Sequence, residues 1–343
     1  MKKILIIALL LVTQKGLLLA QTGGYAGEFT RMGFSPRGMA MGNAMTAVTL
    51  PGSYAYYNPA LAAMPGEDIQ IDISTAALQF DRQLHSAAIR LPLPPTAGLS
   101  FTLLNARVRD IDGRTTDGYH SGMLNTAEYQ LTGSFAVRFS KKVWAGVGIK
   151  YNHAVYHQQI PASTGIGIDA GLLIHLSSRL QAALAIRDLL GSVNIDSSEL
   201  YGTDQALDRD QPFPVRSVVG LSWQVTDRWL LSQDTELRFQ SSTRITDEIS
   251  NQNGFEVPVT RRDEQTSRSL FLRAGSQYQI HDRFTLRSGL ELLDAGSENR
   301  IQPSFGFSVH LPFDRYSPAI DYAFRREPGG FSTMHVFAIR LDI

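Results

Sequence analysis

The chain has 343 residues, with 32 basic and 32 acidic side chains and no cysteine. The balanced charge excludes the basic surface of a nucleic-acid-binding protein, so no nucleic-acid partner is expected. The absence of cysteine excludes disulfides, a lipoprotein anchor and thiolate metal sites. A hydrophobic fraction of 43% is ordinary for a soluble protein, and it also suits a membrane barrel in which apolar and polar residues alternate.

The first twenty residues have the pattern of a secretory signal peptide. Lys2-Lys3 precede an apolar run over Ile4–Val12, and a second apolar run ends at Ala20. Gln14-Lys15 interrupt the run, which is therefore too short for a membrane-spanning helix. We expect residues 1–20 to direct export and to be removed.

The next segment, residues 21–66, does not alternate like a strand. Its small residues and methionines suit a compact helix and turn inside a wide barrel, and Asn58 before Pro59 signals a turn or a helix start. We predict a hatch that is structurally a plug and functionally a gate. The predicted gate residues are Arg37, Gly38, Met41, Gly42, Asn58, Pro59 and Ala60.

From residue 67 to residue 343, stretches with period-two alternation are bounded by Gly, Pro, Asp and Ser. They predict one domain, a 14-stranded antiparallel transmembrane β-barrel whose first and last strands pair. The predicted strands are 67–80, 84–91, 97–110, 126–139, 142–157, 164–176, 179–188, 215–225, 228–240, 268–279, 283–293, 302–311, 317–326 and 333–343.

The connections between these strands alternate in length. Those after strands 2, 4, 6, 8, 10 and 12 are a few residues each, whereas those after strands 3, 7 and 9 are long. Bacterial outer-membrane barrels have an even strand number, tight periplasmic turns and longer external loops. We therefore expect an outer-membrane location with lipid as a partner, and with the short turns and both termini in the periplasm.

The two faces of each strand differ in polarity. Phe284, Leu286 and Leu290 alternate with Arg287 and Glu291, for example. Because a 14-stranded barrel is too wide for side chains to fill, an apolar interior would be a large wet cavity. The apolar face is therefore assigned to lipid and the polar face to the lumen.

Charges of both signs fall on the predicted lumenal face. They could form a salt-bridge lattice that stiffens the wall or a selectivity lining, although mixed signs argue against a strongly ion-selective pore. The long loops 189–214 and 241–267 are expected to be solvated and mobile, or to bind partners. The lumenal charges are Arg138, Lys150, Asp169, Arg187, Asp234, Glu236, Arg238, Arg273, Arg287, Glu291, Asp321 and Arg325.

Catalytic and cofactor motifs are not found. The sequence has no Gly-x-Ser-x-Gly elbow, no His-Glu-x-x-His and no phosphate-binding loop. The acidic stretch around Asp112 has Ser121 where a calcium loop needs Glu, and His153 with His157 is a weak metal pair. We therefore expect no enzyme activity, no cofactor and no metal.

Several motifs resemble a known family. The stretch 37–44 (RGMAMGNA), followed by Tyr57-Asn58-Pro59-Ala60, looks like the N-terminal hatch of FadL-like outer-membrane barrels, closest to the PorV/PorQ group. The stretches 166–172, 185–191 and 214–221 extend the resemblance over residues 25–310.

The resemblance implies a 14-stranded barrel and one of two functions. The main expectation is service to type IX protein secretion or cell-surface attachment, with translocon or attachment components and secreted proteins as partners. The alternative is FadL-like passive transport of hydrophobic small molecules. An outer-membrane enzyme is the third class, and the missing motifs argue against it.

Overall fold

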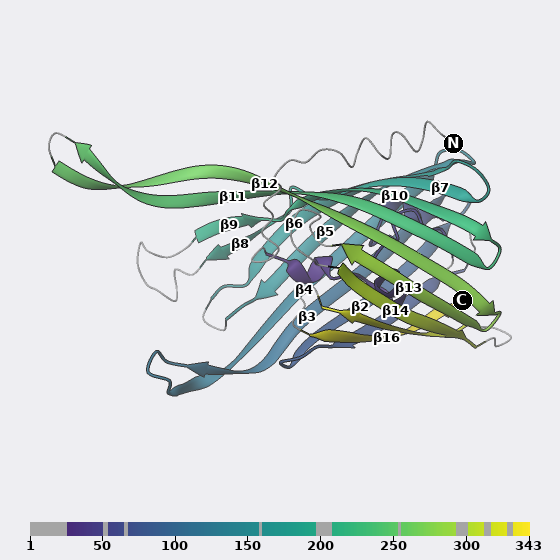
Figure 1. Cartoon of the computed structure of the whole chain (residues 1–343), viewed down its shortest axis with the longest axis horizontal. Helices are drawn as coiled ribbons and strands as arrows, with labels where there is room; N and C mark the ends of the chain where they lie inside the picture. Colours follow the sequence, from purple (N-terminus) through teal and green to yellow (C-terminus); the bar gives the residue numbers. More distant parts are fainter. Residues whose placement is uncertain are drawn as a thin grey trace.

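A computed structural model of the chain describes residues 26–50, 54–64, 68–157, 160–196, 208–252, 255–292, 301–311, 317–327 and 332–343, and leaves the side chains of 208–209 and 242–265 undescribed. The predicted signal peptide, residues 1–20, lies outside the described residues. The described strands form a closed antiparallel barrel (Figure 1) and one separate two-stranded sheet.

The barrel has the fourteen strands that the alternation predicts, in the described part of the chain. Each barrel strand pairs with the barrel strands before and after it in the sequence. The hairpin β8(Ser192–Asp196)–β9(Asp208–Pro212) lies between β7 and β10 in the sequence and does not join the wall. The barrel strands are β1(Gln70–Ala77), β2(Arg82–Leu93), β3(Ala97–Arg114), β4(His120–Arg138), β5(Val143–Val155), β6(Ser163–His175), β7(Leu180–Leu189), β10(Val215–Thr226), β11(Trp229–Gln252), β12(Phe255–His281), β13(Phe284–Leu292), β14(Ile301–His310), β15(Ala319–Arg326) and β16(Thr333–Asp342).

Closure joins the two ends of the sheet. β1 pairs with β16 in an antiparallel register that runs from Gln70 opposite Asp342 to Ala77 opposite His335. Full closure satisfies the backbone hydrogen bonds that an exposed sheet edge would leave unpaired, which a barrel in lipid requires.

The two barrel ends differ, and we name them by their connections. The short-turn end carries the turns at 94–96, 139–142, 227–228 and 282–283. The long-hairpin end carries the projecting β3–β4 and β11–β12 hairpins and the β8–β9 hairpin, which lie together at one side of Figure 1.

The prediction of a long loop at 241–267 is wrong. β11 and β12 continue through this stretch to a register in which Gln252 is opposite Phe255, and they project beyond the wall. A ribbon beyond the wall has no lipid-facing side, so apolar residues need not alternate there. The signal that identified the wall strands is therefore missing. Part of the predicted 189–214 loop is likewise the β8–β9 hairpin.

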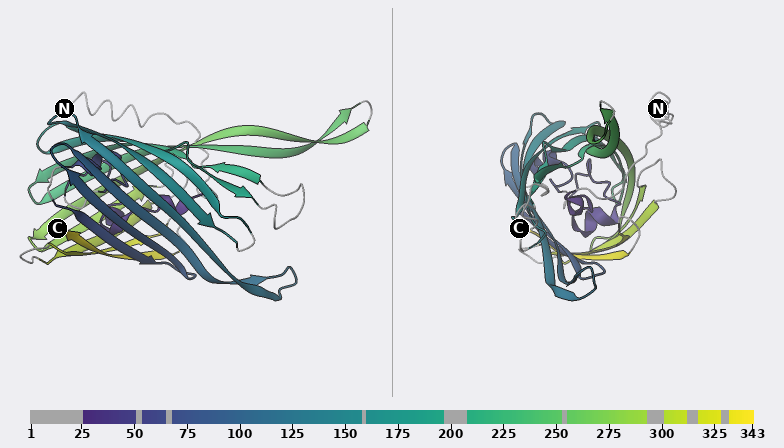
Figure 2. Two further views of the ribbon diagram at one scale, coloured as in Figure 1. Left: turned by 180° about the vertical axis from the view of Figure 1, so that it is seen from behind. Right: turned by 90° about the vertical axis from the view of Figure 1, so that its left-hand side faces the viewer.

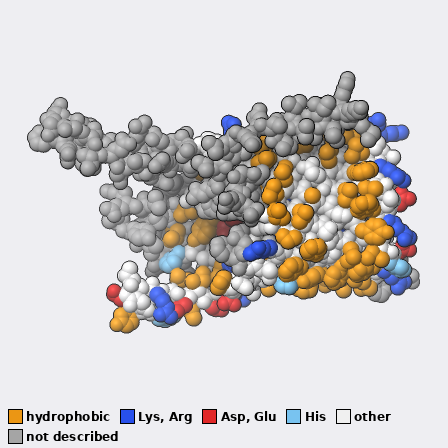
Figure 3. All heavy atoms as spheres, in the orientation of Figure 1, with side chains coloured by type: hydrophobic (Ala, Val, Ile, Leu, Met, Phe, Trp, Pro, Cys, Tyr) orange, Lys and Arg blue, Asp and Glu red, His pale blue; other side chains and the backbone are white. Residues whose placement is uncertain are grey.

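The assignment of the two faces agrees with side-chain exposure. Leu290 is 53% exposed and Leu286 is 42% exposed on the outer surface, whereas Arg287 and Glu291 are 5% and 4% exposed. Apolar side chains spread over the described outer wall in Figure 3. No helix in the described residues is long and apolar enough to cross a membrane.

The exposed apolar wall predicts a direct cost for an outward charge. Leu290→Arg should destabilise the inserted barrel by roughly 2–4 kcal/mol if Leu290 lies near the bilayer midplane. The unfolding free energy in lipid vesicles measures this, with Leu290→Ala as the size control. Equal tolerance of Arg at Leu290, Phe305 and Val219 would show that this surface does not face lipid.

The interior of the barrel holds the N-terminal part of the described chain. Residues 26–50 and 54–64, which we call the interior segment, contain η1(Glu28–Arg31), α2(Ser35–Ala40) and η2(Pro59–Ala63). α2 contacts β1 and β13–β16, while η2 contacts β2–β6 on the neighbouring arc of the wall. The view along the barrel in Figure 2 shows these helical turns inside the ring of strands.

Candidate functional site

The helix α2 of the interior segment begins at Ser35, which has a positive φ of 57°. Phe34 is extended and caps α2, and Pro36 occupies the first turn, where its missing N–H costs nothing. Every residue of α2 is buried, including Arg37. The predicted gate residues Gly38, Met41 and Gly42 lie in or directly after this helix.

The second turn of the interior segment is fixed by Asn58, which also ties it to the wall. The Asn58 side chain accepts a hydrogen bond from the Ala60 N–H at 3.0 Å and so caps η2, which begins at Pro59 as predicted. Its amide donates to the carbonyl of Leu172 on β6, at 3.2 Å, and to that of Thr46, at 3.0 Å. One buried side chain therefore positions three backbone segments.

Wall glycines make room for the interior segment. A Cβ added at Gly171 would lie 1.9 Å from Asn58 Oδ1, and one at Gly289 would lie 2.1 Å from the Gly42 nitrogen. At both positions the neighbour that a side chain would meet is the interior segment. At Gly289 the segment approaches the wall with its backbone, and at Gly171 it does so with the Asn58 side chain.

Buried polar contacts secure the same segment at other strands. Asp72 of β1 accepts hydrogen bonds from Ser35 Oγ at 3.0 Å and from Tyr54 Oη at 2.7 Å. Asp234 of β11 accepts from both the N–H and the hydroxyl of Thr46, at 3.1 and 2.6 Å. Each of these two carboxyl groups therefore joins a wall strand to the interior segment through two hydrogen bonds.

An aromatic cluster fills the centre of the interior segment. Phe34 packs edge-on against Tyr54 at 4.9 Å between ring centroids, and Tyr56 packs against Tyr57 at 4.8 Å. Burial raises the pKa of Tyr57, so its hydroxyl stays protonated and donates to Asn43 Oδ1 at 2.8 Å. The guanidinium of Arg187 lies 4.6 Å from the Tyr56 ring, a cation–π contact between wall and segment.

One group of lumenal charges surrounds Asp188 near the end of β7. Lys150 Nζ lies 2.7 Å from Asp188 Oδ1 and 2.8 Å from Asp169 Oδ2, and Arg216 Nε donates to Asp188 Oδ2 at 2.7 Å. Arg187 lies 3.8 Å from Asp169. All five residues are buried.

A second group runs across β11 to β15. Arg273 bridges Glu236 at 2.8 Å and Glu291 at 2.6 Å, and Arg325 donates to Glu291 at 3.0 Å. Arg325 also donates to the Met32 carbonyl of the interior segment at 2.9 Å. These ion pairs agree with a salt-bridge lattice, and a role in selectivity stays a prediction.

Arg238 joins the second group through a hydrogen bond to Glu236 at 2.9 Å, whereas Arg287, Asp321 and Arg138 lie closer to the short-turn end. Arg287 approaches Asp321 at 3.4 Å. Arg138 is partly exposed and donates to the Pro95 carbonyl at 3.2 Å, so it lies at the rim, outside the two charge groups.

Sequence reasoning missed Asp188 as a lumenal residue because the alternation breaks there. Asp188 has φ 61°, and both Arg187 and Asp188 point inward, which period two forbids for neighbours. The sequence feature that could have revealed Asp188 is its position next to the oppositely charged Arg187 at the end of the strand. Asp72 and Arg216 were missed as well, although each occupies an inward position of its strand.

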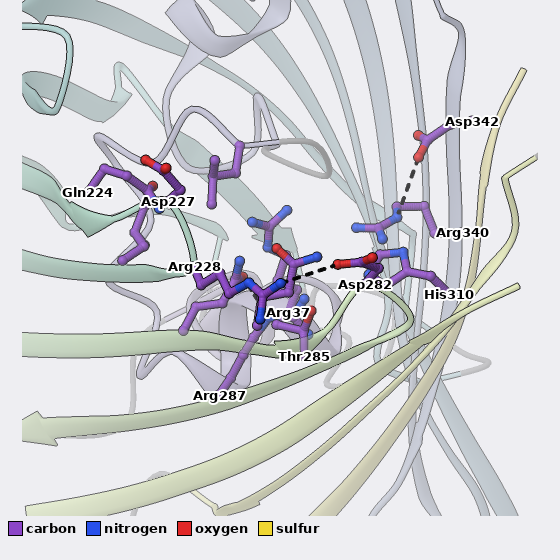
Figure 4. Close-up of a pocket in the computed structure, with 14 residues that line it drawn as sticks. Arg37, Gln224, Asp227, Arg228, Asp282, Thr285, Arg287, His310, Arg340 and Asp342 are labelled. Carbon is purple, nitrogen blue, oxygen red and sulfur yellow. Dashed lines mark hydrogen bonds and ion pairs between the residues drawn. The ribbon is translucent and has the colours of Figure 1, made fainter. Parts of the chain in front are cut away.

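Two cavities border the interior segment, one towards each barrel end. The long-hairpin cavity has about 230 Å³. Its lining combines apolar side chains, such as Phe29, Met32, Leu78, Leu84 and Val108, with the charged residues Glu28, Arg82, Arg107, Glu128 and Glu327. The short-turn cavity has about 320 Å³ and is lined mainly by charged and polar side chains (Figure 4). Among the described residues, no His, Cys, Asp or Glu cluster could hold a metal ion.

Comparison with known proteins gives structural likeness only. Neither a protein-family model nor a curated protein sequence matches the chain. Among solved structures, the Pseudomonas putida toluene transporter TodX superposes with a TM-score of 0.59 at 12% identity, over 90% of this chain and 97% of that chain.

Two further structures have similar scores. A Pseudomonas aeruginosa FadL homologue matches with a TM-score of 0.59 at 13% identity, over 90% of this chain and 97% of that one. The CymD monoaromatic hydrocarbon channel matches with a TM-score of 0.55 at 13% identity, over 91% and 97%. The chain therefore has the closed 14-stranded transmembrane barrel fold of these FadL-family neighbours.

Proposed function

We propose that the chain is a non-enzymatic outer-membrane barrel that passes small hydrophobic molecules through its wall or lumen. The long-hairpin cavity carries this proposal, because it lies between the interior segment and the wall and its apolar side chains, among them Phe29, Met32 and Leu84, offer a binding place for such a molecule. The structural neighbours named as a toluene transporter and a monoaromatic hydrocarbon channel support the same function. In this proposal the interior segment is the hatch and its displacement opens the path.

The type IX secretion role was the main expectation from sequence, and its support is the resemblance of the hatch motif alone. None of the structures reported above is named for protein secretion. We therefore place hydrophobic transport first. Co-purification of a type IX translocon component or a secreted protein, together with no binding of hydrocarbons, would reverse this order.

Hydrocarbon binding tests the proposal directly. Toluene should displace a fluorescent naphthalene probe from the folded full chain in detergent. Leu84→Glu should weaken probe binding by about tenfold or more, because it places a carboxylate against the apolar ligand. Leu230→Glu, a buried change that lines the short-turn cavity instead, is the matched control. Failure of toluene to displace the probe, or equal losses in both variants, would contradict binding at the long-hairpin cavity.

The orientation of the barrel is a separate prediction. Because short turns face the periplasm in outer-membrane barrels, Ser177 should lie on the periplasmic side of the membrane and Gln252 on the cell surface. The chain has no cysteine, so single cysteines at these positions give unambiguous labelling with an impermeant reagent in intact cells. Labelling at Ser177→Cys but not at Gln252→Cys would invert the orientation.

A further inference from the structure

The short-turn cavity gathers positive charge from the interior segment and from the wall. Arg37 comes from α2, Arg287 from β13 and Arg340 from β16, and all three guanidinium groups line the cavity (Figure 4). Each residue is 5% exposed or less. Three buried cations from three elements thus share one space of about 320 Å³.

Two of these arginines have donors without acceptors. Arg37 Nε, Arg340 Nε and Arg340 Nη1 are buried, and none has a hydrogen-bond partner among the described residues. Arg37 also forms no ion pair with any described residue. The carboxylate nearest to Arg340 Nε is that of Asp342, at 4.0 Å. A buried guanidinium normally finds an acceptor for its fork of N–H groups.

Asp321 and Asp72 near the cavity each accept hydrogen bonds through one carboxylate oxygen. Their other oxygens, Asp321 Oδ2 and Asp72 Oδ1, and Asp342 Oδ1 are buried without a hydrogen-bond partner among the described residues. Asp321 accepts from Ser308 and from Arg287, and Asp72 accepts from Ser35 and Tyr54. At the rim, Asp227 and Asp282 are 93% and 84% exposed, and they lie near Arg179 and Arg228. No carboxylate among the described residues accepts a hydrogen bond from Arg37 Nε, Arg340 Nε or Arg340 Nη1, so these donors are available to a small anion in the cavity.

The charge of Arg37 is held at a cost. Burial, together with repulsion from Arg287 and Arg340, lowers the pKa of Arg37 to about 9. An anion among the three guanidinium groups would reverse that repulsion and provide the missing acceptors, as planar oxyanions do for arginine forks.

We propose that the short-turn cavity is a binding site for a small oxyanion, a carboxylate or a phosphate, held by Arg37 and Arg340 with Arg287 beside them. Because Arg37 belongs to the interior segment and the other two to the wall, the anion joins the segment to the barrel. Binding of the anion therefore stabilises the position of the interior segment inside the barrel. The same oxyanion chemistry could come from a free ion or from the head group of an amphiphile, and the site does not depend on the proposed hydrocarbon transport.

Calorimetric titration of the full chain, folded in a non-ionic detergent, tests this site. The probes are inorganic phosphate, acetate and octanoate. At least one should bind with one-to-one stoichiometry and raise the thermal unfolding midpoint, because a ligand of the native state stabilises it. Arg37→Gln and Arg340→Gln should each weaken that binding by about tenfold or more, since each removes charge-assisted hydrogen bonds.

Two controls make the result specific. Arg138→Gln removes an arginine at the rim of the same end, outside the cavity, and should leave the affinity unchanged. Arg37→Lys keeps the charge but not the fork, so its affinity should fall between those of the wild type and Arg37→Gln. Heat-modifiable gel migration reports whether each variant is folded.

The outcomes separate the source of the anion and can overturn the site. If phosphate or acetate binds about as tightly as octanoate, the natural ligand is a free anion. If only octanoate binds, the ligand is the head group of an amphiphile. No binding of any probe, or equal affinities in the wild type, Arg37→Gln and Arg340→Gln, would overturn the proposal. If the protein binds an anion but does not bind toluene, only the proposed transport function is overturned.

Discussion

Deletion of residues 25–65 should convert the barrel from a blocked to a conducting state. The barrel ladder lies outside the interior segment and closes through β1 and β16, so the wall should still form. Without the segment, the polar interior of a 14-stranded barrel fills with water, and conductance in planar bilayers should rise by roughly an order of magnitude or more.

The control for this deletion keeps the segment but weakens its attachment. Asn58→Asp retains the capping oxygen and removes the donor to Leu172, so it should produce brief openings rather than a permanent pore. Unchanged low conductance in the deletion would show that other residues block the lumen. A deletion variant that does not fold would assign the segment to assembly and would favour the scaffold function over transport.

Removal of the Asp188 charge should cause the largest loss of stability among single lumenal changes. Asp188 is the shared acceptor of Lys150 and Arg216, and all three are buried. Asp188→Asn leaves Arg216 without its carboxylate and leaves Lys150 with Asp169 alone. Breaking a buried ion pair in this way costs roughly 3–5 kcal/mol. Denaturant unfolding of the barrel in lipid vesicles gives the difference in free energy.

Asp227→Asn provides the comparison for that measurement. Asp227 is 93% exposed and lies 3.3 Å from Arg179, so its loss should change stability by about 1 kcal/mol or less. A similar small effect at Asp188 would mean that water reaches the Lys150 and Arg216 side chains. The salt-bridge lattice would then contribute little to the stability of the wall.

The wall could be predicted from the sequence because every wall strand meets two different environments. That contrast gives period-two alternation, and it identified the fourteen strands and both faces, as the opposite exposures of Leu290 and Glu291 show. Where the contrast disappears, the prediction fails, as in the projecting part of β11 and β12. It also fails at the positive φ of Asp188, where two neighbouring residues point inward.

The details of the candidate site could be predicted only in part. The Asn58-Pro59 signal correctly located the start of η2, because capping is a local interaction. The contacts of Gly171 and Gly289 with the interior segment join residues more than one hundred positions apart, and a glycine in a strand pattern does not reveal its neighbour. The unpaired donors of Arg37 and Arg340 likewise follow from tertiary packing, which composition does not report.

The pairing of β1 with β16 has a consequence for the order in which the protein assembles. α2 packs on β1 and β13–β16, which include both ends of the sheet, while η2 packs on the neighbouring arc β2–β6. The contacts of α2 with β1 and with β16 can exist together only after the first and last strands have met. We therefore expect the contacts of α2 with both ends of the sheet to form late in folding. Contacts of this kind lengthen the lifetime of a folded protein more than they speed its formation.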